Sequence, residues 1–210
     1  MKKEKVKKIF EILHNQNPNA RIELHYTNAF TLLIAVVLSA QATDIQVNKI
    51  TPPIFEEIST PQDLINKGEA WLFEKVKSIN YNKTKAANLY KAAIKLESEF
   101  GGKVPDNREA LQTLAGVGRK SANVILNSIF HCPTMPVDTH VFRVANRTGL
   151  VISESLLEVE ENLVKIIPPE HALVAHHLLV LHGRYICKAL KPGCQNCKIN
   201  HLCQFKQKTT

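Results

Sequence analysis

Apolar residues recur at helical spacing along most of the chain, and no stretch alternates apolar and polar residues for long enough to predict a strand. Between Val6 and Leu13 they fall on one face, which predicts a short amphipathic helix ending before Asn17-Pro18. The same spacing predicts further helical segments at residues 29–40, 71–79, 86–96, 121–129, 139–147, 154–166 and 171–181. The expected fold class is therefore all-α.

Proline, glycine and capping residues mark where these helices should start and stop. Pro52-Pro53 is expected to break the helical signal, and Gly101-Gly102 to end the helix before it. Asp106 followed by Glu109 has the spacing of a capping box, so Asp106 is expected to cap the next helix.

That helix leads into a glycine-rich turn. Gly116 and Gly118 flank Val117, and glycine tolerates the left-handed angles of a tight hairpin between two short helices. A glycine-rich turn at a helix N-terminus presents unpaired N–H groups, which makes it a seat for an anion such as a phosphate. Lys120 stands in the first turn of the following helix. The simpler alternative is a helix–helix turn with a solvated lysine.

Composition narrows the class of protein. The 210 residues are 44% hydrophobic and 22% charged, which excludes a disordered chain and allows one large domain or two small ones. A formal net charge of +8 favours a polyanionic partner, although basic proteins need not bind one. The lysine-rich start includes Glu4 and has no apolar core, so no signal peptide is expected. The apolar run at residues 29–40 is too short to cross a bilayer. A cytoplasmic monomer without membrane contact is expected.

Four of the five cysteines form a second pattern near the C-terminus. Cys187, Cys194, Cys197 and Cys203 have the spacing C-x6-C-x2-C-x5-C. In a cytoplasmic protein this favours a metal centre over disulfides. Zinc and an iron–sulfur cluster both remain open on spacing alone, because only one C-x2-C pair is present. Cys132 is expected to be a buried, inert thiol.

Segments 114–124 and 137–143 resemble the helix-hairpin-helix and catalytic segments of the endonuclease III family of DNA glycosylases, and segment 38–44 resembles a third motif of that family. The resemblance covers nearly the whole chain. It implies two helical domains with a DNA cleft between them. Residues 22–132 would form a barrel holding the hairpin, and residues 1–21 plus 133–210 a domain whose four cysteines hold a 4Fe-4S cluster.

The resemblance also implies an activity. The family removes oxidised or ring-saturated pyrimidines from double-stranded DNA and cleaves abasic sites, with Lys120 matching the nucleophile and Asp138 the assisting carboxylate. Partial burial beside Arg119 is expected to favour the neutral, reactive amine of Lys120. Asp138 precedes a helix, so an N-cap is the alternative and is compatible with catalysis.

The expected DNA contacts are Gln41, Tyr81, Gly116, Val117, Gly118, Arg119 and Lys191. In the family the residue matching Gln41 enters the space left by the flipped nucleotide. A buried glutamine satisfied by backbone is the alternative. Tyr81 is the predicted apolar wedge, with a surface tyrosine in a turn as the alternative.

The chain departs from the family at two turns. Ala115 replaces the usual hairpin proline, and Asn80 replaces a glycine whose left-handed angles it can adopt less readily.

Two other functions remain open at this level. Monofunctional adenine glycosylases share the hairpin, aspartate and cluster but lack the lysine, so Lys120 argues against that class. A non-catalytic DNA-binding iron–sulfur protein would leave Gln41 and Asp138 unexplained.

Overall fold

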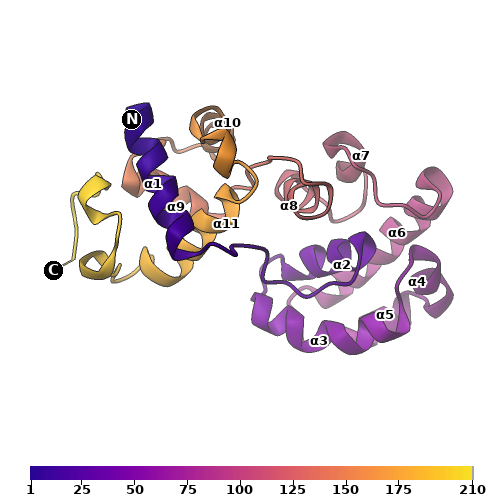
Figure 1. The fold of residues 1–210 in the computed structure, drawn as a ribbon. Helices are drawn as coiled ribbons and strands as arrows, with labels where there is room; N and C mark the ends of the chain where they lie inside the picture. Colours follow the sequence, from indigo (N-terminus) through magenta and orange to yellow (C-terminus); the bar gives the residue numbers. More distant parts are fainter. Residues whose placement is uncertain (210) are drawn as a thin grey trace. The chain divides into compact units, whose positions relative to one another are not determined.

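A computed structural model describes residues 1–209, and every regular element within them is helical, which confirms the all-α fold class (Figure 1). The chain forms two compact units. One comprises Glu23–Phe130, and the other comprises Met1–Ile22 together with the described chain from His131 onward. No helix among the described residues combines the length and apolarity needed to cross a membrane.

The first unit is built around a buried helix. Its elements are α2 (Ala29–Ser39), α3 (Asp44–Glu57), α4 (Pro61–Lys67), α5 (Glu69–Lys75), α6 (Asn82–Phe100), α7 (Arg108–Gln112) and α8 (Arg119–Phe130). Every residue of α2 from Phe30 to Leu38 is buried, because the helix is apolar on all sides and contacts α3, α6 and α8. Only the two ends of this central helix can therefore contribute groups to the surface of the unit.

Pro52 and Pro53 do not break the helical signal as predicted, since α3 continues through them to Glu57. Both prolines are exposed, so their rings lie on the side of the helix that faces water and not on its packed side. Continuing the helix also buries Ile54 on the same side as Val47. The burial of that face outweighs the local preference of proline.

The cap of α7 also differs from the prediction. Asn107, not Asp106, is the N-cap, and its side chain accepts a hydrogen bond from the Ala110 N–H at 2.9 Å. Asparagine and aspartate cap about equally well, so propensity could not separate these two neighbours.

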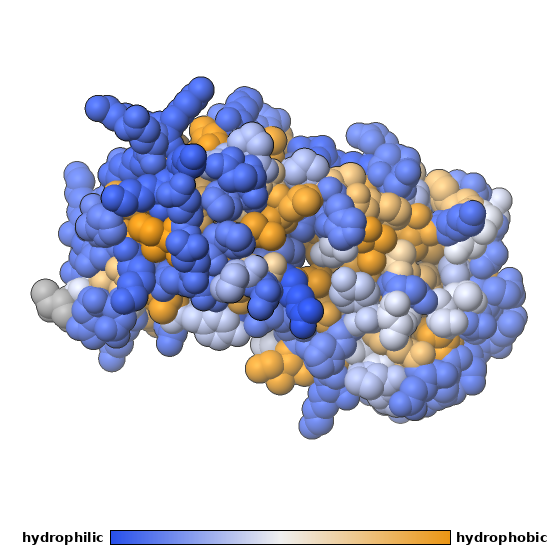
Figure 2. Space-filling view, viewed as in Figure 1, coloured by the Kyte–Doolittle hydropathy of each residue, from blue (hydrophilic) through white to orange (hydrophobic). Residues whose placement is uncertain are grey.

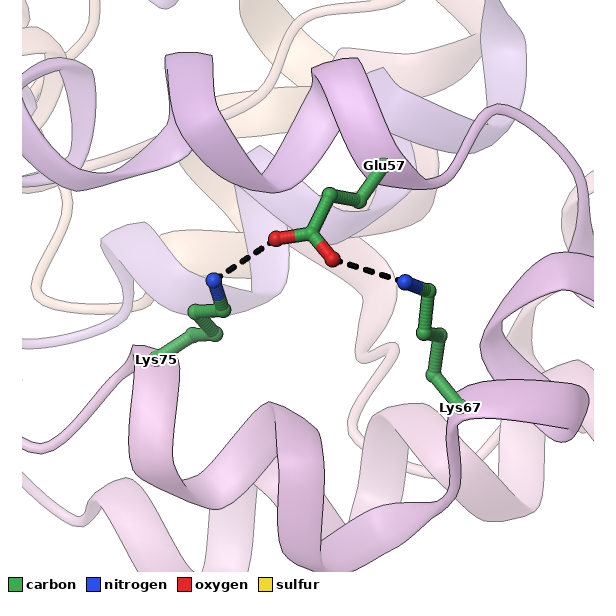
Figure 3. Close-up of polar contacts among 3 residues, drawn as sticks. All are labelled: Glu57, Lys67 and Lys75. Atoms are coloured by element: carbon green, nitrogen blue, oxygen red, sulfur yellow. Dashed lines mark hydrogen bonds and ion pairs between the residues drawn. The ribbon is translucent and has the colours of Figure 1, made fainter.

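One ion-pair group ties α3, α4 and α5 together (Figure 3). Glu57 accepts hydrogen bonds from Lys67 Nζ and Lys75 Nζ, each at 2.7 Å. These bonds lower the pKa of Glu57 to about 2. Both ammonium groups also lie over the ring of Trp71, 5.4 and 5.3 Å from its centroid.

The second unit packs around α9 (Thr139–Thr148), which contacts α10 (Leu156–Ile166), α11 (Ala175–Leu181) and a π-helical turn at His182–Ile186. The N-terminal helix α1 (Lys3–Gln16) lies against α11 and ends where predicted. Its exposed side is mostly lysine and glutamate, and the surface over α1 in Figure 2 is correspondingly hydrophilic. Short 3-10 turns occupy Pro169–His171, Cys194–Asn196 and Asn200–Leu202.

Two predicted boundaries in this unit are wrong. The segment expected to be helical from residue 171 begins with a 3-10 turn, and α11 starts only at Ala175. The preceding helix starts at Leu156, because Ser155 caps it by accepting from the Glu158 N–H. Cys132 is half-buried rather than fully buried.

Candidate active site

The turn between α7 and α8 forms the expected hairpin, with one difference. Only Gly116 adopts left-handed angles, at φ +83°, so Gly118 is not required for the shape of the turn. Leu114 and Val117 are buried and hold the turn to the unit. Within residues 1–209 the backbone N–H groups of Gly116 and Gly118 donate no hydrogen bond. Two donors therefore remain at the exposed start of α8, where the helix dipole adds partial positive charge.

Lys120 lies directly after this turn. Its side chain is exposed, so the expected partial burial is wrong; the buried face of α8 begins at Ala122. Arg119 is also exposed. A Cβ atom added at Gly118 would meet nothing within 4 Å, which leaves open space beside the two amides.

Gln41 and Tyr81 belong to neighbouring segments of the same unit. Gln41 follows α2 with φ +55°, and Tyr81 precedes α6 with φ +57°. Asn80 Nδ2 donates to the Gln41 carbonyl oxygen at 3.1 Å. The left-handed residue of this loop is Tyr81 and not Asn80, whose side-chain amide binds Gln41 instead. Tyr81 is 64% exposed and makes no capping bond.

Asp138 caps α9, as one interpretation of the sequence predicted. Its Oδ1 accepts the N–H groups of His140 at 2.9 Å and Val141 at 2.8 Å. In the described part of the chain Oδ2 accepts no hydrogen bond. The cap fixes the position of the carboxylate and leaves Oδ2 available to interact with another group.

The other end of α9 holds the start of the cysteine loop. Arg143 donates to the carbonyl groups of Gly183 and Cys187, each at 2.8 Å. Arg147 donates to the carbonyl groups of residues 188 and 189, at 2.7 and 3.0 Å. One helix therefore positions both Asp138 and the loop.

The four cysteines predicted as ligands line one cavity. The space free of protein atoms there is about 340 Å³, part of it open to solvent, and Ile199 and Phe205 add apolar walls. Among the described residues no three His, Cys, Asp or Glu side chains come close enough to bind one metal ion. The four cysteines nevertheless line the same space. Cysteine thiolates are ligands of both iron–sulfur clusters and zinc ions, so either group could be held here.

Hydrogen-bond donors reach these sulfurs. Arg147 Nη1 lies 3.7 Å from Cys187 Sγ, and the Phe205 N–H donates to Cys203 Sγ at 3.5 Å. Burial raises the pKa of the Cys197 and Cys203 thiols. Donors to sulfur are typical of thiolate sites that bind iron.

The sequence reasoning missed Lys85. It lies on α6, is only 6% exposed, and donates from Nζ to two carbonyl groups at the end of α2. The available signal was spacing, since Lys85 stands four residues before the buried Leu89 and thus on the apolar face.

Known proteins and solved structures resemble this chain over most of its length. The family model described as HhH-GPD superfamily base excision DNA repair protein matches residues 34–169. Endonuclease III of Haemophilus influenzae is 48% identical over 208 residues, 99% of each chain. Two solved structures, a trapped endonuclease III–DNA covalent intermediate and a non-covalent endonuclease III–DNA complex, each superpose with a TM-score of 0.91 at 42% identity, covering 97% of this chain and 96% of theirs.

The matched range is more than half of the chain and includes both the hairpin and Asp138. The family and the enzyme class expected from the sequence are confirmed. The chain belongs to the endonuclease III family, within the HhH-GPD superfamily of base excision DNA repair proteins.

Proposed function

We propose that Lys120 and Asp138 carry the bifunctional reaction of this family, in which an oxidised or ring-saturated pyrimidine is removed from double-stranded DNA and the strand is cleaved at the abasic site. The proposal is supported by the exposed lysine beside two bare amides, by a carboxylate with one oxygen unused, and by relatives solved with DNA.

Lys120 supplies the nucleophile. Its neutral Nζ bonds to C1′ of the deoxyribose as the glycosidic C–N bond breaks, and the base leaves with the bonding electrons and takes up a proton. The C1′–O4′ bond then breaks, O4′ takes up a proton, and the nitrogen loses one as it forms the C=N bond of a Schiff base. This Schiff base acidifies the proton on C2′. Loss of that proton expels the 3′ phosphate, so one amine serves both base removal and strand cleavage.

Asp138 acts by charge. Its carboxylate accepts a proton from the Lys120 ammonium and stabilises the cationic sugar as the base departs. An amide at this position would keep the cap but lack the charge. The two backbone bonds to Oδ1 restrict the side chain, so little reorganisation accompanies the reaction.

The hairpin and the cysteine loop receive the DNA backbone. Gly116 and Gly118 offer N–H donors to a phosphate, Val117 secures the turn, and Arg119 adds positive charge. Lys191 is exposed on the cysteine loop and adds a further phosphate contact. These contacts position the duplex without reading its sequence.

Gln41 and Tyr81 hold the duplex open. Rotating a nucleotide out of the stack costs a few kcal/mol, and side chains that refill the gap offset that cost. Gln41 supplies a polar group for the emptied position, and the exposed ring of Tyr81 stacks on the neighbouring base.

Cys187, Cys194, Cys197 and Cys203 hold a 4Fe-4S cluster in this proposal. When bound, the cluster cross-links four points of a loop that has little core of its own, which keeps Lys191 and its neighbours in place. Purified protein should be brown, absorb broadly near 400 nm and contain about four iron atoms per chain. One zinc ion in colourless protein would contradict the assignment.

The observation that carries the proposal is the placement of Lys120 in the exposed first turn of α8, and borohydride trapping on an abasic duplex tests it. Wild-type protein should form a covalent adduct. Lys120→Gln should bind DNA and form none, whereas Lys191→Gln, with the same charge loss, should still be trapped. Undiminished trapping of Lys120→Gln would exclude it as the nucleophile.

Asp138→Asn separates charge from capping in the same assay. Its melting temperature should stay close to that of wild type because asparagine also caps, while turnover on a damaged duplex should fall by about a hundred-fold or more. Near-normal turnover would leave Asp138 as a cap alone.

A further inference from the structure

Lys85 is a buried lysine that the reaction just described does not use. It lies in the first turn of α6 and is 6% exposed. Among the described residues no carboxylate forms an ion pair with it. Burying an unpaired charge is unfavourable, and a methionine of similar length would fill the space without that penalty. Packing alone therefore does not explain a lysine here, and its role must depend on the N–H donors of the ammonium group.

Those donors bind the end of α2. Lys85 Nζ donates to the carbonyl oxygens of Leu38 at 2.8 Å and Ala40 at 2.6 Å. The last carbonyl groups of a helix lack intrahelical partners and carry partial negative charge, which favours a cation there. Gln41 is the next residue along the chain. Lys85 thus holds the two peptide groups that determine where Gln41 leaves the helix.

The backbone of Lys85 holds the second loop. Its N–H donates to the Tyr81 carbonyl oxygen at 2.9 Å, which closes the first turn of α6. One residue is therefore bonded to the segments carrying both Gln41 and Tyr81. Asn80 adds a second link between them through the Gln41 carbonyl. Both Gln41 and Tyr81 adopt left-handed angles, a conformation that persists in non-glycine residues only when the surroundings enforce it.

We propose that Lys85 is a positioning residue that fixes Gln41 relative to Tyr81 before DNA binds, so that both side chains enter the duplex as one unit. The inference rests on the proposed function, since it concerns the two side chains assigned there to holding the duplex open. A site of this kind depends on supporting contacts that lock its geometry in advance. Without Lys85, Gln41 and Tyr81 would have to be ordered during each flipping event.

Two substrates and two matched variants test this. Lys85→Met removes the buried donors, and Lys91→Met makes the same change at an exposed position of the same helix, with the same charge loss. Base removal is measured in single turnover on a duplex with one ring-saturated pyrimidine. Strand cleavage is measured on a single-stranded abasic site, which needs no flipping. The readout is the ratio of the two rates.

Lys85→Met should lower the duplex rate by about ten-fold or more and change the single-strand rate by less than about two-fold. Lys91→Met should leave the ratio unchanged. Partial unfolding would lower both rates equally and leave the ratio at its wild-type value. A wild-type ratio in Lys85→Met would overturn the positioning role.

Asn80→Ala is the second variant, in case Lys85→Met does not fold. It removes the other link at an exposed position, so the core is untouched, and the ratio should fall by about two- to three-fold. An unchanged ratio there, with Lys85→Met unfolded, would also reject the inference. Covalent trapping of the wild-type protein on the abasic strand tests the proposed function separately. If no adduct forms, the proposed function is rejected. If the adduct forms but the rate ratios of the variants equal that of wild type, only the role of Lys85 is rejected.

Discussion

The glycine hairpin and the paired loops at Gln41 and Tyr81 are built on opposite principles within one unit. The hairpin owes its shape to the backbone: Gly116 adopts the left-handed angle, and two unpaired amides form the surface proposed to receive a phosphate. At the paired loops the left-handed residues carry large side chains, and other side chains hold them there, chiefly Lys85 and Asn80.

The difference matches the role proposed above for each region. A surface that receives a phosphate benefits from the absence of side chains, because N–H groups can then approach the anion closely. A surface that enters the base stack needs side chains at fixed positions, so its backbone must be supported from outside. Loss of a glycine should therefore damage the first region, and loss of a buried donor the second.

The largest effect should come from Gly116→Ala. A Cβ atom there would lie 3.2 Å from Asn88 Cβ and 3.3 Å from Val37 Cγ1, at a backbone angle unfavourable for alanine. The free energy of unfolding should fall by about 1–2 kcal/mol, and the affinity for an abasic duplex by about ten-fold or more as the amides move. Thermal melting and DNA titration measure the two quantities.

Gly118→Ala is its control. The new methyl group meets nothing within 4 Å, so the melting temperature should not change, while the methyl occupies space needed by a phosphate and weakens binding. Unchanged affinity would show that the backbone of the duplex does not approach this turn.

Tyr81→Gly should have the next largest effect. Glycine adopts φ +57° without strain, so stability should be equal or slightly higher. Base removal from a damaged duplex should slow by about ten-fold, because a stacking ring is lost, while cleavage of a single-stranded abasic site stays the same. Equal losses on both substrates would mean that Tyr81 supports the fold and not the duplex.

The smallest effect should come from Glu57→Gln, which weakens the unit away from both regions. The pKa of Glu57 is lowered from 4.5 to about 2, so its contribution to stability is complete above pH 4.5 and is lost as pH falls toward 2. The difference in melting temperature between variant and wild type should therefore shrink over that range. Exposed ion pairs contribute little, so the difference is small throughout.

Base removal and DNA affinity at neutral pH should be unaffected by Glu57→Gln. A loss of either would show that general stability of α3–α5, and not local support, limits the two regions.

The turn of the hairpin and the gathering of the four cysteines could be predicted because each is a local pattern set by residue type and spacing. Lys85 could not, because a lysine in a helix is ordinarily solvated, and its burial depends on where α2 ends in space. The partial burial expected for Lys120 was wrong for the converse reason: the first turn of α8 precedes its buried face.

Local sequence signals also gave wrong helix boundaries where two of them pointed to different structures. Asp106 and Asn107 are equivalent caps in sequence, and only the path of the chain into α7 selects Asn107. Pro52 and Pro53 oppose a helix locally, but their exposure and the burial of Ile54 decide in its favour.

Arg147 binds the backbone of the cysteine loop, and this affects which substitutions the loop can tolerate. Its guanidinium donates to the carbonyl groups of Lys188 and Ala189, which every amino acid possesses, and not to their side chains. Leu190, the next residue, is 85% exposed. Substitutions across residues 188–190 thus leave the attachment intact. Mutation can tune the charge of this stretch, and with it the attraction for DNA, while the loop itself stays in place.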